Sequence, residues 1–178
     1  MTSPTRSPAP PATSHTPHTP AAFITPEALR EHWQGHRRLT RRVIAAFPDE
    51  QLFTHSVGGM RSFGELAVEI VRMAVPSLHG AATGEWKSME EMFGGRPAPT
   101  SRAALLAEWD ETTAEIDRLW PTIPAERFQA HDVAFGQWPG PIHALLLYVI
   151  DNEVHHRAQG YVYLRALGTE PPPFYDRS

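Results

Sequence analysis

The residues with the clearest chemical potential lie together in the last third of the chain. The segment 151–159 reads Asp-Asn-Glu-Val-His-His-Arg-Ala-Gln and combines acids, an amide and two imidazoles in one short stretch. Leucines and tyrosines flank it, so much of the segment is expected to be buried. Buried polar groups are costly unless they are paired or bind something. The segment therefore indicates either a set of ligands or a satisfied hydrogen-bond network.

Two pairs in this segment share a helix face, because residues four apart lie one turn apart. One pair is Asn152 with His156, and the other is Asp151 with His155. His-x-x-x-His on a helix is a metal-binding spacing, but asparagine at position 152 removes its two-histidine form. Metal sites in helical bundles take further ligands from a facing helix. Glu69 is the obvious candidate, because it is an acid within an otherwise apolar run.

Four long helices are predicted to position these residues. Start and stop signals include Thr25-Pro26, the Ser62–Glu65 capping-box spacing, Pro121 and Gly168. The expected ranges are about 25–47, 62 to 80 or 84, 100–120 and 141–167. A short amphipathic piece at 85–93 precedes the third helix, and the long connection 121–140 is expected to be irregular. No run alternates with the period of a strand, so we predict an all-α antiparallel four-helix bundle with a short extra helix.

The two ends of the chain have distinct compositions. Residues 1–22 are rich in Pro, Ser and Thr and are expected to form a disordered tail, in which His15 and His18 are solvated. The remaining residues, 23–178, are predicted to form one domain. Near the C-terminus, Phe174 and Tyr175 follow three prolines and are expected to pack back onto the bundle. Trp33, Trp109, Trp120 and Trp138 are interpreted as core or pocket wall.

Composition excludes several classes of function. The net charge of −4 over 178 residues predicts no polyanion-binding surface, and the patch Arg37-Arg38 with Arg41-Arg42 is interpreted as a solvated helix face. We therefore expect no nucleic-acid partner. The absence of cysteine excludes disulfides, thiolate nucleophiles and Cys-ligated zinc, and is compatible with a reducing cytoplasm. No apolar run or secretory signal is present, so a cytoplasmic location without a membrane partner is expected.

Several segments together carry a family resemblance. The stretch 55–66 reads His-Ser-Val-Gly-Gly-Met-Arg-Ser-Phe-Gly-Glu-Leu, and much later come Glu-Val-His-His-Arg-Ala-Gln at 153–159, Tyr-Leu-Arg-Ala-Leu-Gly at 163–168 and Pro-Pro-Phe-Tyr at 172–175. This combination resembles the DinB/YfiT-like family over roughly residues 25–176. The resemblance implies a four-helix bundle, often a homodimer, with a divalent metal held by three histidines. One ligand comes from the second helix and two come from the last.

The resemblance also implies classes of activity. Relatives include thiol-dependent transferases and isomerases that use low-molecular-weight thiols, and many members have no known activity. Several were named as products of DNA-damage-inducible genes, which suggests a place in stress response. Those names describe regulation rather than mechanism.

The family's metal ligands fall on Glu69, Asn152 and His156, so only one of the three histidines is retained. Carboxylate suits zinc, manganese or iron(II), and nickel is a further candidate ion. Asparagine is a weak oxygen ligand that is usual with calcium. The resemblance therefore implies an altered centre that binds transition metals more weakly than a three-histidine site. In such a site Glu69 or a nearby acid could act as a base, with His155 or Gln159 orienting the incoming group.

Two alternatives stay open. Glu69, His156 and Asn152 can form a buried hydrogen-bond network that needs no ion. The ligands can also lie elsewhere, and the candidates are then His55, His143, and Asp151 with His155. His32 and His36 have a metal-like spacing, but their neighbours Gly35 and Arg37 indicate an exposed face. Arg157 and Arg165 suggest either surface salt bridges or contacts to an anionic substrate.

The sequence thus supports two classes of function. The first is a metal-dependent hydrolase or thiol-dependent transferase relative with an altered Glu/Asn/His centre. The second is a non-catalytic helical bundle that binds a small ligand or a protein partner and holds no metal. An enzyme needs an ion or a base held in the pocket, whereas a binder needs only a suitable pocket.

Overall fold

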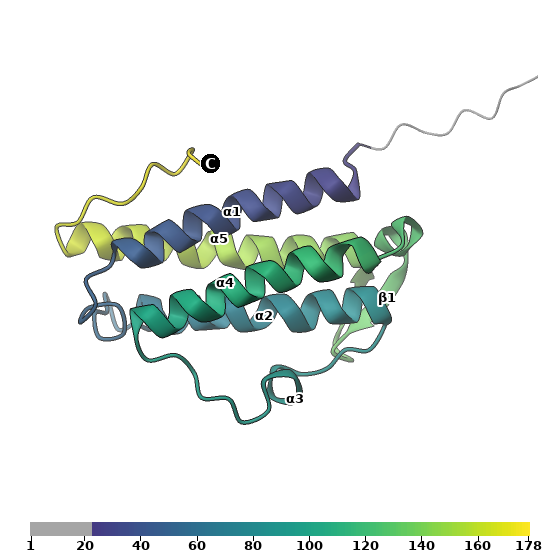
Figure 1. The fold of residues 1–178 in the computed structure, drawn as a ribbon, viewed down its shortest axis with the longest axis horizontal. Coiled ribbons are helices and arrows are strands. Elements are labelled where there is room, and N and C mark those ends of the chain that lie inside the picture. Colours follow the sequence, from purple (N-terminus) through teal and green to yellow (C-terminus); the bar gives the residue numbers. More distant parts are fainter. Residues whose placement is uncertain (1–22) are drawn as a thin grey trace, which may run out of the picture.

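The computed structural model of the protein describes residues 23–178 and shows a mostly helical fold (Figure 1). The expected tail, residues 1–22 with His15 and His18, lies outside the described residues. The helices are α1 (Pro26–Ala46), α2 (Phe63–Thr83), the short α3 (Met89–Phe93), α4 (Arg102–Leu119) and α5 (Ile142–Ala166). The predicted short extra helix is confirmed as α3.

Local capping explains where the long helices begin and end. The Thr25 hydroxyl accepts a hydrogen bond from the backbone N–H of Ala28 at the start of α1. Ser62 and Glu65 form the expected capping box at the start of α2. Gly84 ends α2 in the left-handed region, at φ 79°, and α2 continues through Pro76 without ending there. These are side-chain and backbone contacts within one turn, which is why the sequence predicts them well.

The four long helices lie alongside one another (Figure 1). α2 packs against α5 and α4, and α1 packs against the same two helices. None of the helices in residues 23–178 is long and apolar enough to cross a bilayer.

The connection before α5 is more ordered than expected. It contains two 3-10 helices, Trp120–Thr122 and Ala125–Gln129, and an antiparallel hairpin of β1 (His131–Ala134) and β2 (Trp138–Pro141). The expectation of an irregular, strand-free connection was therefore wrong. β2 reads Trp-Pro-Gly-Pro, which has no alternation of apolar and polar residues, so its periodicity gives no strand signal.

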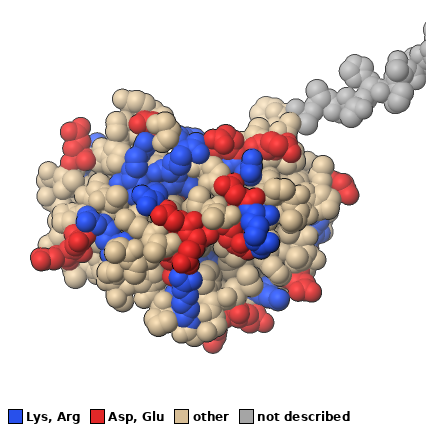
Figure 2. All heavy atoms as spheres, in the orientation of Figure 1, with Lys and Arg blue, Asp and Glu red and all other residues tan. Residues whose placement is uncertain are grey.

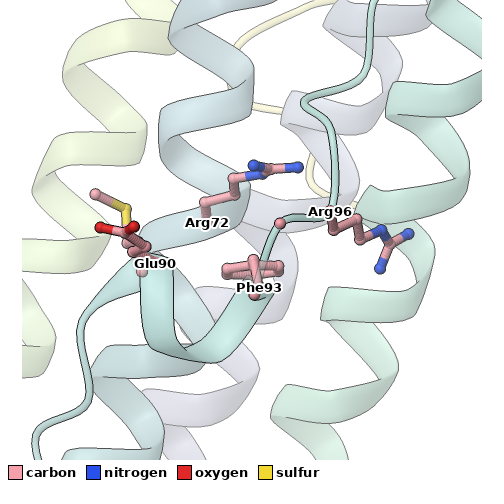
Figure 3. Close-up of a pocket in the computed structure, with 7 residues that line it drawn as sticks. Arg72, Glu90, Phe93 and Arg96 are labelled. Carbon is pink, nitrogen blue, oxygen red and sulfur yellow. The ribbon is translucent and has the colours of Figure 1, made fainter.

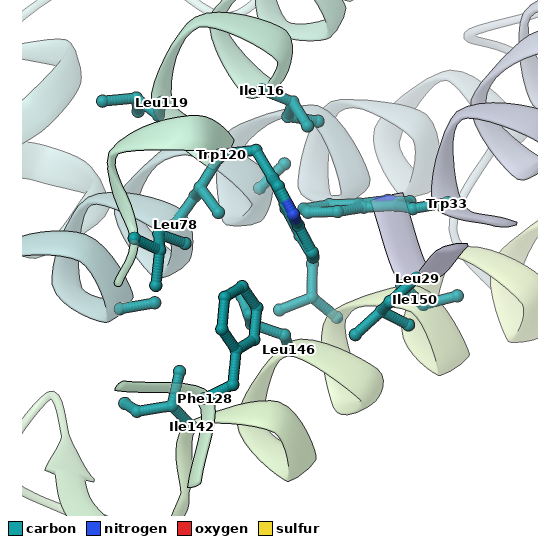
Figure 4. Packing of buried hydrophobic residues seen from close by; sticks show 14 residues of the cluster. Leu29, Trp33, Leu78, Ile116, Leu119, Trp120, Phe128, Ile142, Leu146 and Ile150 are labelled. Atoms are coloured by element: carbon teal, nitrogen blue, oxygen red, sulfur yellow. The ribbon is translucent and has the colours of Figure 1, made fainter. Parts of the chain in front are cut away.

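Two apolar clusters fill the space between the helices. One lies at the hairpin end and includes Trp33, Trp120 and Phe128 (Figure 4). The other lies at the opposite end and includes Phe47 and Trp109. Three of the four tryptophans expected in the core or pocket wall are thus buried. Trp138 is exposed on the hairpin, so for that residue the expectation was wrong.

The C-terminal segment does not bury its aromatic side chains. Phe174 and Tyr175 are largely exposed, which corrects the expectation that they pack back onto the bundle. Polar contacts hold the segment to α1 instead. The Arg38 guanidinium donates to the backbone oxygen of Arg177 at 2.8 Å, and Arg42 donates to the backbone oxygen of Ser178 at 3.0 Å.

A layer of polar side chains lies between the helices α1, α4 and α5. Arg37 is buried, with its guanidinium 3.6 Å from the centroid of the Trp109 ring and 3.0 Å from the Trp109 backbone oxygen. Arg157 is also buried and lies 3.9 Å from the buried carboxylate of Glu153. The expectations of a solvated helix face for Arg37 and of a surface salt bridge for Arg157 were wrong, because both guanidinium groups are buried and contact partners within the core.

The rest of the predicted basic patch lies at the surface and is paired with acids. Arg38 bonds Glu31 at 2.8 Å, and Arg41 bonds Asp110 at 2.6 Å. Figure 2 shows basic and acidic side chains interspersed over the face seen there. The local positive charge is therefore largely compensated.

Candidate functional site

The structure brings Glu69 of α2 against Asn152 and His156 of α5. Oε1 of Glu69 lies 3.0 Å from Nε2 of His156 and accepts a hydrogen bond from Nδ2 of Asn152 at 3.3 Å. The other carboxylate oxygen, Oε2, lies 2.7 Å from the guanidinium of Arg61. We call these four residues the polar cluster. Its rim is open to solvent, since the side chains of Glu69 and Arg61 are 26% and 51% exposed.

Neighbouring residues hold the polar cluster in place. Nδ1 of His156 lies 2.9 Å from Oε1 of Gln159, one turn further along α5. Each ring nitrogen of His156 thus lies within hydrogen-bond distance of a side-chain oxygen. The Tyr163 hydroxyl donates to the backbone oxygen of Arg61 at 3.0 Å and ties the segment before α2 to α5.

The environment of Glu69 favours its charged form. Burial by itself raises the pKa of this carboxyl, but hydrogen bonds from Arg61, His156 and Asn152 outweigh burial, and the pKa is lowered from 4.5. Glu69 is therefore a carboxylate at neutral pH. It acts as an acceptor for three side-chain donors.

Arg61 is the member of the polar cluster that sequence reasoning missed. It precedes the N-cap of α2 and lies eight residues before Glu69, a spacing that carries no helical-face signal outside the helix. The available clue in the sequence was a cationic residue in the loop just before the helix that carries Glu69. Gln159, by contrast, was predicted near the site and contacts His156 directly.

Other predicted candidates lie elsewhere. His55 packs edge-on against Tyr163, with ring centroids 5.9 Å apart. Nδ1 of His143 lies 2.8 Å from the backbone oxygen of Phe128. Asp151 and His155 are exposed on the outer face of α5, and the His155 ring lies edge-on to its neighbour His156 at 5.0 Å. None of these four has a hydrogen bond to Glu69 among the described residues.

The pair on α1 differs from its prediction. His36 is buried rather than exposed, and its Nε2 lies 3.2 Å from Nε2 of His32. Nδ1 of His36 lies 2.9 Å from a guanidinium nitrogen of Arg157, which can only donate. The ring proton of His36 therefore lies on Nε2 and points at His32. A metal ion bridging the two rings would have to displace that proton.

Burial and nearby cations keep His36 neutral. Burial, followed by the charges of Arg157 and Arg177, lowers the pKa of His36 from 6.5 to about 3. The His32–His36 hydrogen bond thus extends the buried network of Arg157 towards the surface. The two rings satisfy each other as a hydrogen-bonded pair.

The donors of the polar cluster differ from the three-histidine set that the family resemblance implies. Glu69 and His156 are the only strong ligands present, and both are already bonded to protein partners. A cation bound to Glu69 would also stand next to the positive charge of Arg61. Within residues 23–178, no group of three or more His, Asp or Glu side chains is placed to hold a metal ion. The donor set therefore does not fit a tightly bound transition-metal ion.

One atom of the cluster is left unsatisfied. Oδ1 of Asn152 is buried and has no hydrogen-bond partner among the described residues. Buried polar atoms of this kind usually find a protein group, a water molecule or a ligand. This oxygen is the feature of the site most open to an additional partner.

Two hollows in the described surface are lined by none of the four residues of the polar cluster. One of about 300 Å³ opens between α2 and α3 and includes Arg72, Phe93 and Arg96 in its lining (Figure 3). Both arginines lie close to the buried carboxylate of Glu108, at 3.0 and 3.7 Å, so their charge is largely compensated. A second hollow of about 380 Å³ includes Phe53, Glu65 and Val68.

Comparisons with known proteins identify the family. A DinB-like protein from Bacillus cereus ATCC 10987 matches with a TM-score of 0.65 and 21% identity, over 84% of this chain and 97% of that one. A DinB-like protein from Bacillus subtilis matches with a TM-score of 0.64 and 18% identity, over 84% and 99%. These likenesses concern the fold alone. No protein with a curated description matches the chain. The family model described as "DinB family" matches residues 20–178, so this chain belongs to the DinB family.

Proposed function

We propose that this DinB-family protein binds a small polar ligand at the polar cluster and does so without a resident high-affinity metal ion. The observation that carries the proposal is the bonding of Glu69, whose two oxygens contact His156, Asn152 and Arg61. Where the family's metal is expected, the chain has an acid held by three nitrogen donors. The framework is the family's antiparallel four-helix bundle.

The chemistry of the cluster suggests the type of ligand. The half-exposed guanidinium of Arg61 can bind an anionic group, such as a carboxylate or phosphate, because its planar N–H donors match two oxygens. The Glu69 carboxylate can accept a hydrogen bond from a neighbouring hydroxyl, amine or thiol of the same ligand. A low-molecular-weight thiol that carries carboxylates has both features. We expect the protein to act in the cytoplasm, and a role in stress response is a hypothesis that rests on the family resemblance.

The competing function is that of a metal-dependent hydrolase or thiol-dependent transferase with an altered centre. One observation favours it, namely the buried Oδ1 of Asn152 without a partner. Asn152, Glu69 and His156 would then be the ligands of zinc, nickel, manganese or iron(II). The ion pair between Arg61 and Glu69, at 2.7 Å, opposes metal binding because Arg61 already neutralises the charge of Glu69.

Ligand binding is tested by thermal-shift and calorimetric titration of the purified protein with small carboxylates, phosphate and glutathione-like thiols. We expect at least one anionic probe to raise the melting temperature, and the variants Arg61→Ala and Glu69→Gln to abolish that rise. Arg118→Ala is the matched control, because Arg118 is an exposed arginine paired with a single acid, Glu115. The proposal fails if no anionic probe binds, or if binding survives in both cluster variants.

Elemental analysis separates the two functions. The protein is exposed to Zn, Ni, Mn and Fe(II), desalted and measured alongside Glu69→Gln and His156→Ala. We expect no near-stoichiometric ion in any of the three. An ion that is retained by the natural protein and lost in both variants would overturn the metal-free proposal and establish an altered metal centre.

A further inference from the structure

A second cluster of polar side chains lies where α1, α5 and the C-terminal segment meet. It consists of Arg42 of α1, Arg157, Tyr161 and Arg165 of α5, and Arg177 of the C-terminal segment. We call these five residues the arginine cluster. It lies on the side of α5 that faces α1, whereas the polar cluster lies on the side that faces α2. Figure 2 shows basic side chains gathered over α1.

Tyr161 has a buried hydroxyl that forms no hydrogen bond among the described residues. Arg157 and Arg165 lie one turn before and one turn after it on α5. Burial raises the pKa of this phenol, and the charges of Arg157, Arg42 and Arg165 partly offset that rise. A guanidinium group only donates hydrogen bonds, so these arginines offer no acceptor to the hydroxyl. The partner that suits the hydroxyl is therefore an acceptor, and a negatively charged one suits its neighbours.

Arg42 presents a second buried donor of this kind. Its Nε has no acceptor among the residues that the structure describes, although Nη1 donates to the backbone oxygen of Ser178 at 3.0 Å. Nη2 donates to the backbone oxygen of Asp176. Nε and Nη2 form the edge of a guanidinium group that matches two oxygens of a carboxylate or phosphate. At Arg42 this edge meets one neutral carbonyl oxygen, so half of it is used.

The arginine cluster carries more positive charge than nearby acids compensate. Within residues 23–178, its four arginines meet two carboxylates, those of Asp176 and Glu153, at 3.4 and 3.9 Å. Neither Arg165 nor Arg177 forms an ion pair in this part of the chain. The surplus charge and the two unpaired donors favour the same kind of partner, an oxyanion.

Residues 174–178 already place one acid beside this cluster. The Asp176 carboxylate lies next to Arg42, and the two side chains are 43% and 34% exposed. Ion pairs with this much exposure contribute little to stability. Phe174 and Tyr175 are largely exposed, so packing adds little to the hold of this segment on α1. An oxyanion from solution can therefore compete with Asp176 for Arg42.

We propose that the arginine cluster is an anion-binding site, in which Arg42 and Tyr161 bind a phosphate or carboxylate group of a small molecule. The Nε–Nη2 edge of Arg42 takes two oxygens, the Tyr161 hydroxyl donates to one of them, and Arg165 and Arg177 supply positive charge. Asp176 is then an internal competitor that the bound anion displaces. The site is separate from the polar cluster and does not rest on the function proposed there.

Side-chain NMR of the full chain tests the site, with inorganic phosphate and succinate as separate probes. We expect the Nε–H signal of Arg42, identified by its loss in Arg42→Lys, to shift saturably with at least one probe. The tighter probe shows whether the site prefers a phosphoryl or a carboxylate group. A signal that moves with neither probe overturns the proposal.

Two variants remove the proposed contacts one at a time. Arg42→Gln and Tyr161→Phe should each weaken binding of the probe by about tenfold or more, because each removes a donor to a charged acceptor. Circular dichroism checks that both keep the fold. Arg41→Gln is the matched control for the arginine, because Arg41 is its exposed neighbour on α1 and pairs with Asp110. Tyr148→Phe, at an exposed position of α5, is the control for the hydroxyl. Unchanged affinity in either Arg42→Gln or Tyr161→Phe overturns the proposal.

Arg61→Ala separates this site from the polar cluster. We expect the Arg42 signal to shift in this variant as in the natural protein, because Arg61 contacts Glu69 on the α2 side of α5. Loss of that shift would overturn a separate site. Failure of the polar cluster to bind any probe would instead leave the Arg42 shift intact.

Asp176→Asn tests the internal competitor. The variant keeps the size of the side chain and removes the charge next to Arg42, so binding of the probe should tighten by about two- to fivefold, the worth of one exposed ion pair. Asp110→Asn is the matched control, because it removes the acid that pairs with Arg41 and should leave the affinity unchanged. An affinity in Asp176→Asn equal to that of the natural protein overturns the displacement of Asp176.

Discussion

At the scale of single residues, Glu69 shows how a partly buried acid can be satisfied by side-chain donors from two other segments. Its carboxylate is charged because three donors outweigh the cost of partial burial. The His36 ring shows the opposite case, since burial and arginine neighbours hold it neutral. The pKa of each side chain is shifted by partners far away in sequence. Both shifts lead to effects on stability that can be measured.

Glu69→Gln keeps the size of the side chain and removes its charge. We expect the free energy of unfolding to fall by about 1–2 kcal/mol at pH 7, because the bonds to Arg61 and His156 lose their charge assistance. Urea denaturation measures this change. Glu115→Gln, which affects one exposed pair with Arg118, should cost about 0.5 kcal/mol or less. Equal losses in the two variants would contradict a stabilising role of the polar cluster.

His36 gives a pH dependence whose sign follows from its pKa. The folded value of about 3 lies below the ordinary value of 6.5, so the unfolded chain binds a proton first as the pH falls. The contribution of His36 to stability is therefore complete above about pH 6.5 and is lost as the pH falls towards 3, by at most about 1.4 kcal/mol per pH unit.

The variant His36→Asn tests this assignment by urea denaturation from pH 7 to pH 4.5. Asparagine can still accept a hydrogen bond from Arg157 but does not titrate, so the pH dependence should become flatter. His131→Asn, which removes a histidine at an exposed strand position, is the matched control. The assignment is wrong if the two variants show the same slope as the natural protein.

At the scale of elements, close contact between helices depends on positions without a side chain. Gly160 of α5 lies against Phe63 at the start of α2, where an added Cβ would come within 2.5 Å of the ring. Phe63 is itself buried and stacked on Phe47, with centroids 4.8 Å apart. The α2–α5 contact next to the polar cluster therefore requires glycine at position 160.

Gly160→Ala should destabilise the protein by about 1–3 kcal/mol, because the buried ring has little room to move. Gly35→Ala on α1 is the matched control. Its Cβ would lie 3.3 Å from the Cβ of Arg177, a much smaller overlap than at Gly160, so the better helix propensity of alanine should leave stability equal or raise it by up to about 1 kcal/mol. Guanidinium denaturation of both variants measures the difference, and a neutral Gly160→Ala would show that the contact is loose.

At the scale of the whole molecule, the polar layer joins two apolar clusters into one core. Glu153 lies at its centre, where Oε2 accepts a hydrogen bond from Trp33 Nε1 at 3.2 Å and Oε1 lies 2.6 Å from the Thr40 hydroxyl. Arg157 donates to the same hydroxyl at 3.0 Å. The layer thus fixes how α1 and α5 align between the two clusters.

Glu153→Ala should cost about 3–5 kcal/mol, because it leaves the Arg157 guanidinium buried without its acid. Glu153→Gln retains acceptors and donors for Trp33 and Thr40 and should cost less. Equilibrium unfolding followed by both tryptophan fluorescence and circular dichroism measures the losses and shows whether unfolding stays a single transition. A loss below about 1 kcal/mol for the alanine variant would mean that the two clusters align without this layer.

The sequence by itself determined the helices, the family and three members of the polar cluster. Capping at Thr25 and Ser62 acts within one turn, and the spacing of Asn152 and His156 places both on one helix face whatever surrounds them. Glu69 could be recognised because a single acid interrupted an apolar run. Such signals depend on neighbours along the chain, which a sequence displays directly.

Only the tertiary structure decided the environments of the remaining residues. Arg61 joins Glu69 because Tyr163 of α5 holds the preceding loop, and Arg37 is buried because Trp109 of α4 covers it. Trp138 is exposed although its residue type favours burial. Burial and pairing depend on which distant segments meet, and for long polar side chains one guanidinium can be satisfied by solvent or by a partner across the core. Helix periodicity does not distinguish these two outcomes.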